Sequence, residues 1–311
     1  MKADIDCDSV DATVAYVAGN SEPFRFTDEQ AGRELETDAI RARIEASILN
    51  LSPETEALKP KEISPKVYRV ELENATVLRA RVIVPLSGSA AAQENAALAA
   101  VQFQGARIEP GESLSFNQTV GMRTEESGYT AAEEPAYGQN IVGVGGGVCQ
   151  VSTALYQLAL LGGLEIAERS AAVYPVDYCE IGQEAAVSDQ GLDLVLTNNT
   201  DAPLFLVVRV YAENDGQTME WQLIGKENES RFSLVSEVET IDAPEEPVYV
   251  RDSEGRYATY ADERIPVSEA RPGYRATVSL VDENGETVRV VSEDTYDAMA
   301  QIVYVGVQQR N

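Results

Sequence analysis

The residues Gly143-Val-Gly-Gly-Gly-Val-Cys149-Gln-Val-Ser-Thr-Ala-Leu-Tyr156 form the most informative motif in the middle of this chain. Its glycines deliver Cys149 to the start of a segment whose apolar residues repeat at helical spacing. We expect a helix that begins at Cys149 and stops at Gly162-Gly163, with buried side chains at Leu155, Leu158 and Ala159. Oriented N–H groups at a helix N-terminus favour a thiolate, so this placement is typical of a reactive thiol. The chain contains no histidine, and therefore no imidazole to serve that thiol as a base.

The composition is strongly acidic. Lysine and arginine number 24 against 52 aspartates and glutamates, which gives a formal net charge of −28. This charge disfavours nucleic acids and anionic membrane surfaces as partners, because both would repel it. The acidic residues are spread along the chain, as expected for a solvated surface.

The sequence also limits the compartment and the cofactors. No stretch reaches the about 18 apolar residues that a membrane span needs, and Met1–Cys7 has no apolar core typical of a signal peptide. Three cysteines, Cys7, Cys149 and Cys179, do not make a disulfide framework. Without histidine and without ligand spacing between the thiols, we expect no metal and no cofactor.

A chain of 311 residues predicts two or three domains. We expect three: residues 1–75 as a small α+β unit, residues 76–225 as the middle unit, and residues 226–311 as an all-β unit. In the first unit, strand-like segments flank a helix that Thr37 can cap and that places apolar residues on one face. The strands are expected at Asp11–Val17, Pro23–Thr27 and Val67–Leu72, and the helix face at Ile40, Ile44, Ile48 and Leu51.

The fold class predicted for the whole chain is multidomain α+β, in which a central, mainly antiparallel sheet carries the helix of Cys149. Further elements of the middle unit are a strand at Thr76–Val84, a helix at Glu94–Val101, and a turn followed by a strand at Pro110–Asn117. Leu192–Leu196 and Leu204–Tyr211 are expected to form a hairpin through the turn at Asn198–Asp201, with the second strand buried on both faces.

In the last unit, Asn284-Gly285 predicts a type I′ hairpin turn between two strand-like segments, Thr277–Val281 and Thr287–Val291. Pro244-Glu-Glu-Pro247 is expected to mark a domain boundary or a linker. The last unit is therefore predicted to be a small all-β domain.

The middle unit resembles the VanW family, which is named for a protein carried with vancomycin-resistance genes. The resemblance covers roughly residues 94–205 and rests on motifs at Pro110–Asn117, Val120–Thr124, Gly128-Tyr129, Gly145–Thr153, Glu168-Arg169, Tyr178 and Leu192–Leu194. Family members usually carry a His-Ser pair after the Glu-Arg motif, and here Ala172 and Val173 stand at those positions. Residues 9–72 also resemble a peptidoglycan-binding domain that often precedes this family's core. The last unit resembles the small all-β domain named for five glycines, which is associated with cell-wall amino sugars.

Three readings of Cys149 follow. The first is a reactive thiol tuned by the helix and the glycines, in a layout similar to that of papain-like enzymes. The second is a small buried residue kept for packing at a helix–sheet junction. The third is a disulfide, with Cys179 as the partner in an oxidising compartment.

The other candidate site residues also have a structural alternative. Gly145, Gly146 and Gly147 leave room for a substrate backbone, and Gln150, Ser152 and Thr153 offer polar groups to a ligand or to the helix's own free N–H groups. Arg123 and Arg169 can bind a carboxylate of a peptide or sugar acid, or form structural ion pairs. Tyr129, Tyr156 and Tyr178 can stack on sugar rings or pack in the core. Glu168 and Glu184 are conceivable as an acid/base pair, although no spacing fixes them together.

The resemblance implies an exported protein at the bacterial cell surface, anchored to the membrane in its full-length form, which binds peptidoglycan or its precursors. The absent histidine favours binding without cysteine catalysis. Two alternatives stay open: a papain-like cysteine hydrolase or transferase acting on cell-wall peptides, and a structural or assembly protein of the cell surface.

Overall fold

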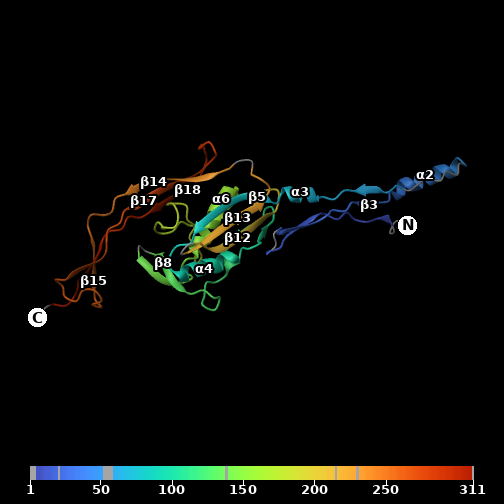
Figure 1. Cartoon of the computed structure of the whole chain (residues 1–311). Helices are drawn as coiled ribbons and strands as arrows, with labels where there is room; N and C mark the ends of the chain where they lie inside the picture. Colours follow the sequence, from blue (N-terminus) through green and yellow to red (C-terminus); the bar gives the residue numbers. More distant parts are fainter. Residues whose placement is uncertain are drawn as a thin grey trace. The chain divides into compact units, whose positions relative to one another are not determined.

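The structure, a computed structural model, describes residues 5–19, 22–51, 59–136, 139–213, 216–228 and 231–309 (Figure 1). It is mostly β-sheet with few helices. Two compact units divide the chain: Met1–Leu78 with Ile224–Glu227, and Arg79–Leu223 with Asn228–Asn311. The second unit thus contains both the middle and the C-terminal part of the chain, and the division into three domains stays a prediction. None of the described helices combines the length and apolar character needed to cross a membrane.

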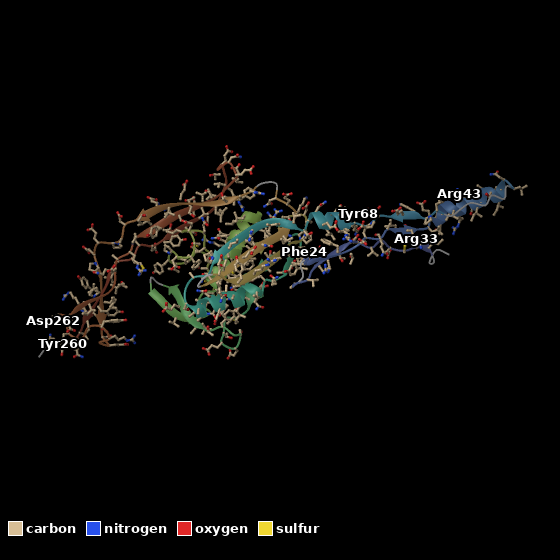
Figure 2. The ribbon with its side chains drawn as sticks, in the orientation of Figure 1. Phe24, Arg33, Arg43, Tyr68, Tyr260 and Asp262 are labelled. Atoms are coloured by element: carbon tan, nitrogen blue, oxygen red, sulfur yellow. The ribbon has the colours of Figure 1, made fainter. Side chains whose placement is uncertain are left out.

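The described residues of the first unit include two small ladders and the helices α2 and α3. The antiparallel pairs are β1 (Thr13–Tyr16) with β2 (Phe24–Thr27), and β3 (Gly32–Glu34) with β4 (Lys61–Ile63). Arg33 of β3 (Figure 2) donates from Nε to the Ile5 carbonyl at 2.7 Å. The expected helix is present as α2 (Thr37–Leu49), but Glu36 occupies its N-cap and no side chain caps it, so Thr37 as the cap was wrong. None of the residues of α2 is buried, and Ile48 is 67% exposed.

The strand predicted at Val67–Leu72 was also wrong, because this segment contains the helix α3 (Arg69–Asn74). Carboxylates satisfy the N–H groups that a helix start leaves unpaired: Glu71 accepts from the Tyr68 N–H at 3.1 Å, and Glu29 accepts from the Arg69 N–H at 2.8 Å. Arg69 also pairs with Glu73, one turn later, at 2.7 Å. These contacts favour a helix over the strand that the short alternation of apolar residues predicts.

The core of the second unit forms around α6 (Cys149–Gly162), which begins at the expected residue and ends at Gly163 in the left-handed conformation. Helix α4 (Ala90–Val101), capped by the Ser89 side chain, packs against α6 and strand β12. One sheet has the order β5 (Val77–Pro85), β13 (Gly216–Gly225), β12 (Leu204–Glu213), β6 (Arg107–Ile108). The largest fully buried side chains include Trp221, Tyr156, Phe103, Phe116 and Leu155.

A second sheet has the order β10 (Glu165–Glu168), β11 (Val195–Thr197), β7 (Ser113–Ser115), and short helix α5 (Phe116–Val120) follows β7. Strands β8 (Ala131–Ala136) and β9 (Gln139–Val144) form a separate ladder. Within residues 79–223, the pairs of described register, β6–β12, β7–β11, β8–β9 and β10–β11, are antiparallel.

The hairpin predicted between residues 192–196 and 204–211 was wrong, because β11 and β12 belong to different sheets. The buried Asn198 side chain explains the redirection. Its Nδ2 donates to the Ile108 and Ala202 carbonyls, both at 2.9 Å, and its Oδ1 accepts from the Thr200 N–H at 3.0 Å. The first five residues of β12 are buried, as the continuous apolar pattern predicts.

Residues 231–309 add two three-stranded sheets. In one, β17 (Gly273–Val281) lies between β14 (Ser233–Ile241) and β18 (Thr287–Tyr296), antiparallel to both. In the other, β19 (Ile302–Gly306) lies between β15 (Val248–Asp252), to which it is parallel, and β16 (Arg264–Ser268), to which it is antiparallel.

The β17–β18 hairpin is present, but its turn is not type I′. In the described part of the chain, Leu51 is the one non-glycine residue with positive φ, so Asn284 is not left-handed as type I′ requires. The Asp282 carboxylate accepts from the N–H groups of Asn284 at 3.0 Å and Glu286 at 2.8 Å instead. This local bond favours a longer turn with Gly285 alone at positive φ, +80°.

Candidate site at the start of helix α6

The glycines before α6 allow two other segments to approach the backbone closely. A Cβ atom at Gly146 would lie 2.6 Å from the Ala132 carbonyl oxygen of β8, and one at Gly147 would collide with the Ala92 carbonyl of α4. Gly147 also has φ +100°, which other residues rarely adopt. The space beside these two glycines is therefore filled by the chain's own backbone.

Cys149 is half-buried at the first position of α6. Its Sγ lies 3.5 Å from the Val187 carbonyl oxygen, to which it can donate. The N-cap residue, Val148, provides no side-chain cap. Cys149 and Cys179 are not linked by a disulfide.

The polar residues that follow Cys149 bind backbone groups of the same chain. Gln150 accepts from the Ser87 N–H at 2.8 Å and donates to the Ser87 carbonyl at 3.2 Å. Ser152 donates to the Ala185 carbonyl at 2.6 Å, and Thr153 accepts from the Ala185 N–H at 3.1 Å. All three side chains are buried. The first turns of α6 thus fix the β5–α4 loop and the segment around Ala185.

Tyr178 and Cys179 lie in the segment that connects β10 to β11. Burial raises the pKa of Tyr178 well above its ordinary value, and the nearby Cys149 thiol adds to this. Burial, followed by the charge of Glu184, raises the pKa of Cys179 to about 12. Both groups therefore stay protonated at neutral pH.

Arg123 is buried and forms an ion pair with Asp189. Its Nε lies 2.8 Å from Oδ1 of Asp189, and Nη1 donates to Oδ1 of Asn117 at 2.7 Å. The Arg123 side chain is only 6% exposed. Tyr129 is also buried, and burial raises its pKa.

Two further residues, to which no sequence pattern assigns a role in the site, organise this region. Asp193 accepts from the Ser115 hydroxyl at 2.5 Å and from the Asn117 N–H at 2.9 Å. Asn95, buried in α4, donates to the Thr130 and Gly146 carbonyls, each at 2.9 Å. An asparagine within an alanine-rich helix is the pattern that could have identified Asn95. For Asp193, the signal was its place inside a family motif.

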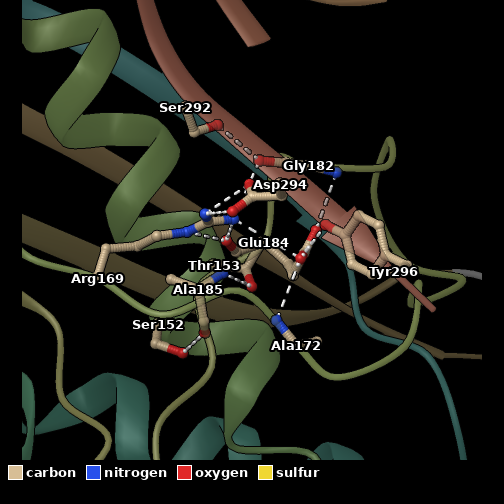
Figure 3. A network of polar contacts seen from close by, with 10 residues as sticks. All are labelled: Ser152, Thr153, Arg169, Ala172, Gly182, Glu184, Ala185, Ser292, Asp294 and Tyr296. Carbon is tan, nitrogen blue, oxygen red and sulfur yellow. Dashed lines mark hydrogen bonds and ion pairs between the residues drawn. The ribbon is translucent and has the colours of Figure 1, made fainter. Parts of the chain in front are cut away.

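Arg169, directly after β10, is the centre of a buried polar network (Figure 3). Its Nε donates to the Glu184 carbonyl at 2.8 Å, and Nη1 lies 2.7 and 2.6 Å from the two carboxylate oxygens of Asp294. The guanidinium carbon lies 5.3 Å from the centroid of the Tyr156 ring. Burial raises the pKa of Tyr156, while the charge of Arg169 opposes that rise.

The Glu184 carboxylate is fully buried in the same network. Oε1 accepts from the Tyr296 hydroxyl at 2.5 Å and from the Ala172 N–H at 3.2 Å, and Oε2 accepts from the Gly182 N–H at 3.1 Å. Burial, and then the bond to Glu184, raises the pKa of Tyr296. Glu168 is exposed, so the two glutamates considered as an acid/base pair have different environments.

The sequence-predicted residues thus fall into three places: the start of α6, the Arg123–Asp189 pair, and the network around Arg169. Among the described residues, no cluster of His, Cys, Asp and Glu has the composition to hold a metal ion.

Comparison with known proteins gives one family match. The model of the family described as VanW-like protein matches residues 91–222. The uncharacterized protein YoaR of Bacillus subtilis (strain 168) is 35% identical over 125 residues, which cover 40% of this chain and 41% of that protein. The vancomycin B-type resistance protein VanW of Enterococcus faecalis (strain ATCC 700802 / V583) is 28% identical over 180 residues, which cover 56% of this chain and 61% of that protein.

The chain therefore spans less than two thirds of the length of either curated relative. A crystal structure of HP0197-G5 aligns with 25% of this chain and all of its own length, at 14% identity. Its TM-score of 0.11 is too low to support any argument about fold. The peptidoglycan-binding domain and the five-glycine domain stay predictions. The resemblance noted in the middle of the sequence is confirmed, and the chain carries a VanW-like domain over residues 91–222.

Proposed function

We propose that this chain is an exported, cell-wall-associated protein that binds peptidoglycan or its precursors without cysteine catalysis. The VanW-like domain and its relatives support the association with the cell wall. The absence of cysteine catalysis is supported by the surroundings of Cys149.

One observation carries the non-catalytic part of the proposal. Ala172 stands where the family usually has a histidine, and the whole sequence contains none. The Ala172 N–H binds the Glu184 carboxylate at 3.2 Å, and the thiol of Cys149 lies against the Val187 carbonyl. A cysteine nucleophile needs a base within hydrogen-bond reach, and this sequence supplies no imidazole for that role.

Exposed apolar side chains near the start of α6 offer a surface for a ligand. Met122 is 60% exposed, Leu192 42% and Val144 40%. The Arg123–Asp189 ion pair connects the segment of Met122 with the segment of Leu192. The segment of Val144 is also close, because a Cβ on the neighbouring Gly145 would lie 2.8 Å from the Arg123 Cβ. Neighbouring exposed apolar residues favour an interaction surface over scattered surface positions.

Co-sedimentation with purified peptidoglycan sacculi tests this function. The intact chain is expected to sediment with sacculi, and Met122→Asp or Leu192→Asp to weaken the binding. Val288→Asp is the matched control, because Val288 is 53% exposed at the start of β18, next to the β17–β18 turn and outside the family-matched segment. Cys149→Ala is expected to leave sedimentation unchanged.

Two results would overturn the proposal. Sedimentation no greater than that of an inert acidic protein would remove peptidoglycan binding and leave the structural or assembly role. Turnover of cell-wall peptides by the unmodified chain, abolished by Cys149→Ala, would establish the cysteine hydrolase or transferase.

A further inference from the structure

The Arg169 guanidinium is oriented by the VanW-like domain itself. Nε and Nη2 donate to the Glu184 carbonyl at 2.8 and 2.6 Å, and Nη2 also donates to the Gly182 carbonyl at 3.1 Å. The ring of Tyr156 lies against the guanidinium. These contacts hold Arg169 without any residue from the C-terminal sheet. Nη1 is then the part of the group that faces Asp294 (Figure 3).

The Glu184 carboxylate is oriented in the same way. The N–H groups of Ala172 and Gly182 each donate to one of its oxygens, at 3.2 and 3.1 Å. Oε1 retains the capacity to accept a second bond, and the Tyr296 hydroxyl supplies it. Nη2 of Arg169 lies 3.6 Å from Oε1 of Glu184, so the two groups form an ion pair within the domain. Beside that pair, Nη1 of Arg169 remains to bind a second carboxylate, and Oε1 of Glu184 remains to accept a further hydrogen bond.

Strand β18 fills both positions in an extended conformation. Asp294 and Tyr296 are two residues apart, so their side chains lie on the same face of the strand. Ser292, two residues earlier, donates to the Gly182 carbonyl at 3.4 Å. Gly182 allows the neighbouring strand β17 to lie close to this segment, because a Cβ there would lie 2.8 Å from Cγ2 of Val278. All three β18 residues lie outside the family-matched segment, residues 91–222, which contains Arg169 and Glu184.

We infer that Arg169 and Glu184 form a recognition site for an extended peptide, and that β18 of the same chain occupies this site in place of the ligand. The ligand's carboxylate would pair with Arg169, and a hydroxyl or amide N–H would donate to Glu184. When part of the same chain occupies the site, an external ligand binds only those molecules in which the site is open. The apparent dissociation constant then equals the intrinsic one divided by the open fraction. Only the source of the ligand, cell-wall peptide, rests on the proposed function.

Isothermal titration calorimetry on the full chain tests this site with N-acetyl-dialanine as the probe, in its free-acid and amide forms. Asp294→Asn removes the competing carboxylate with little change in shape. We expect it to bind the free acid roughly tenfold or more tightly than the unmodified chain does, because the open fraction rises. Neither protein is expected to bind the amide, and adding Arg169→Ala to Asp294→Asn should abolish binding of the acid.

Glu239→Gln is the matched control. Glu239 forms an ion pair with Arg275 at 2.8 Å in the same sheet, but both side chains are mostly exposed. This variant should bind the probes as the unmodified chain does. An Asp294→Asn variant that folds and binds the acid no better than the amide would overturn the inference.

Hydrogen exchange on the unmodified chain keeps the inference testable if Asp294→Asn does not fold. Excess free acid should accelerate exchange of the β18 amides, whereas the amide form should not, and equal exchange with both probes would overturn the inference. Sedimentation of the unmodified chain with sacculi is a separate readout. If the chain does not sediment with sacculi but still prefers the free acid to the amide, the proposed function is wrong and this site is supported. Sedimentation without that preference removes this site alone.

Discussion

The backbone N–H of Ala172 donates to Oε1 of Glu184 at 3.2 Å. This bond links Ala172 to a buried carboxylate that also accepts from Tyr296 and Gly182. The thiol of Cys149 has the Val187 carbonyl as an acceptor. The polar groups around the start of α6 and around Glu184 are therefore held by bonds within the chain.

Replacing Cys149 by alanine should affect stability slightly and binding not at all. The thiol is half-buried against the core and lies 3.5 Å from the Val187 carbonyl oxygen, so we expect a loss of about 1 kcal/mol in the free energy of unfolding. Urea denaturation followed by circular dichroism measures it. A loss of sacculi binding by a variant that remains folded would instead give the thiol a direct role.

Gln150→Leu should lower the free energy of unfolding more than the similar size of the two side chains suggests. The substitution leaves the N–H and the carbonyl of Ser87 without the Gln150 amide, and an unsatisfied buried polar group costs about 1–3 kcal/mol. Gln102→Leu is the control, because Gln102 is exposed and makes one bond of 3.3 Å to Leu98. Denaturation midpoints of the two variants that coincide would argue against a structural role for Gln150.

Gly147→Ala should be far more destabilising than Gly111→Ala. Both glycines have positive φ, +100° and +78°, so alanine is strained at either site by about 1–2 kcal/mol. Only at Gly147 would the Cβ also collide with the Ala92 backbone, whereas nothing lies within 4 Å of a Cβ at Gly111. We expect the Gly147 variant to lose more than about 4 kcal/mol or not to fold. Equal losses would mean that α4 can move away from the turn.

Stability should fall in alkaline solution. The pKa of Cys179 is raised from 9.0 to about 12 by burial, so the folded chain keeps this proton where the unfolded chain has lost it. The folded state then binds more protons, and the free energy of unfolding decreases as pH rises from about 9 to about 12. The raised pKa values of Tyr156, Tyr178 and Tyr296 act in the same direction.

Urea unfolding between pH 8 and 11 measures this effect. Cys179→Ala should flatten the curve, because it removes one of the groups that differ between the two states. Cys7→Ala is the control, since Cys7 is exposed. A free energy of unfolding that stays constant over this range would contradict the protonated, buried state of these groups.

The residue pattern predicted the elements that local interactions determine. Apolar spacing and the flanking glycines located α6 at Cys149, with Gly163 at φ +74° after it, and the motifs identified the VanW-like domain. It failed where short-range contacts compete with a pattern. At α3 the carboxylates of Glu29 and Glu71 pair the first N–H groups of a helix in a segment that alternates like a strand.

Which groups far apart in the sequence come into contact depends on the packing of the whole domain. Arg169 and Asp294 are 125 residues apart, and Glu184 and Tyr296 are 112 residues apart. The residue pattern of either segment does not predict its contact with the other. The same holds for Asn198, which separates β11 from β12 through a bond to Ile108, 90 residues away. Such pairs form because a buried charge or amide must find a partner in the packed chain, and packing alone determines which partner is within reach.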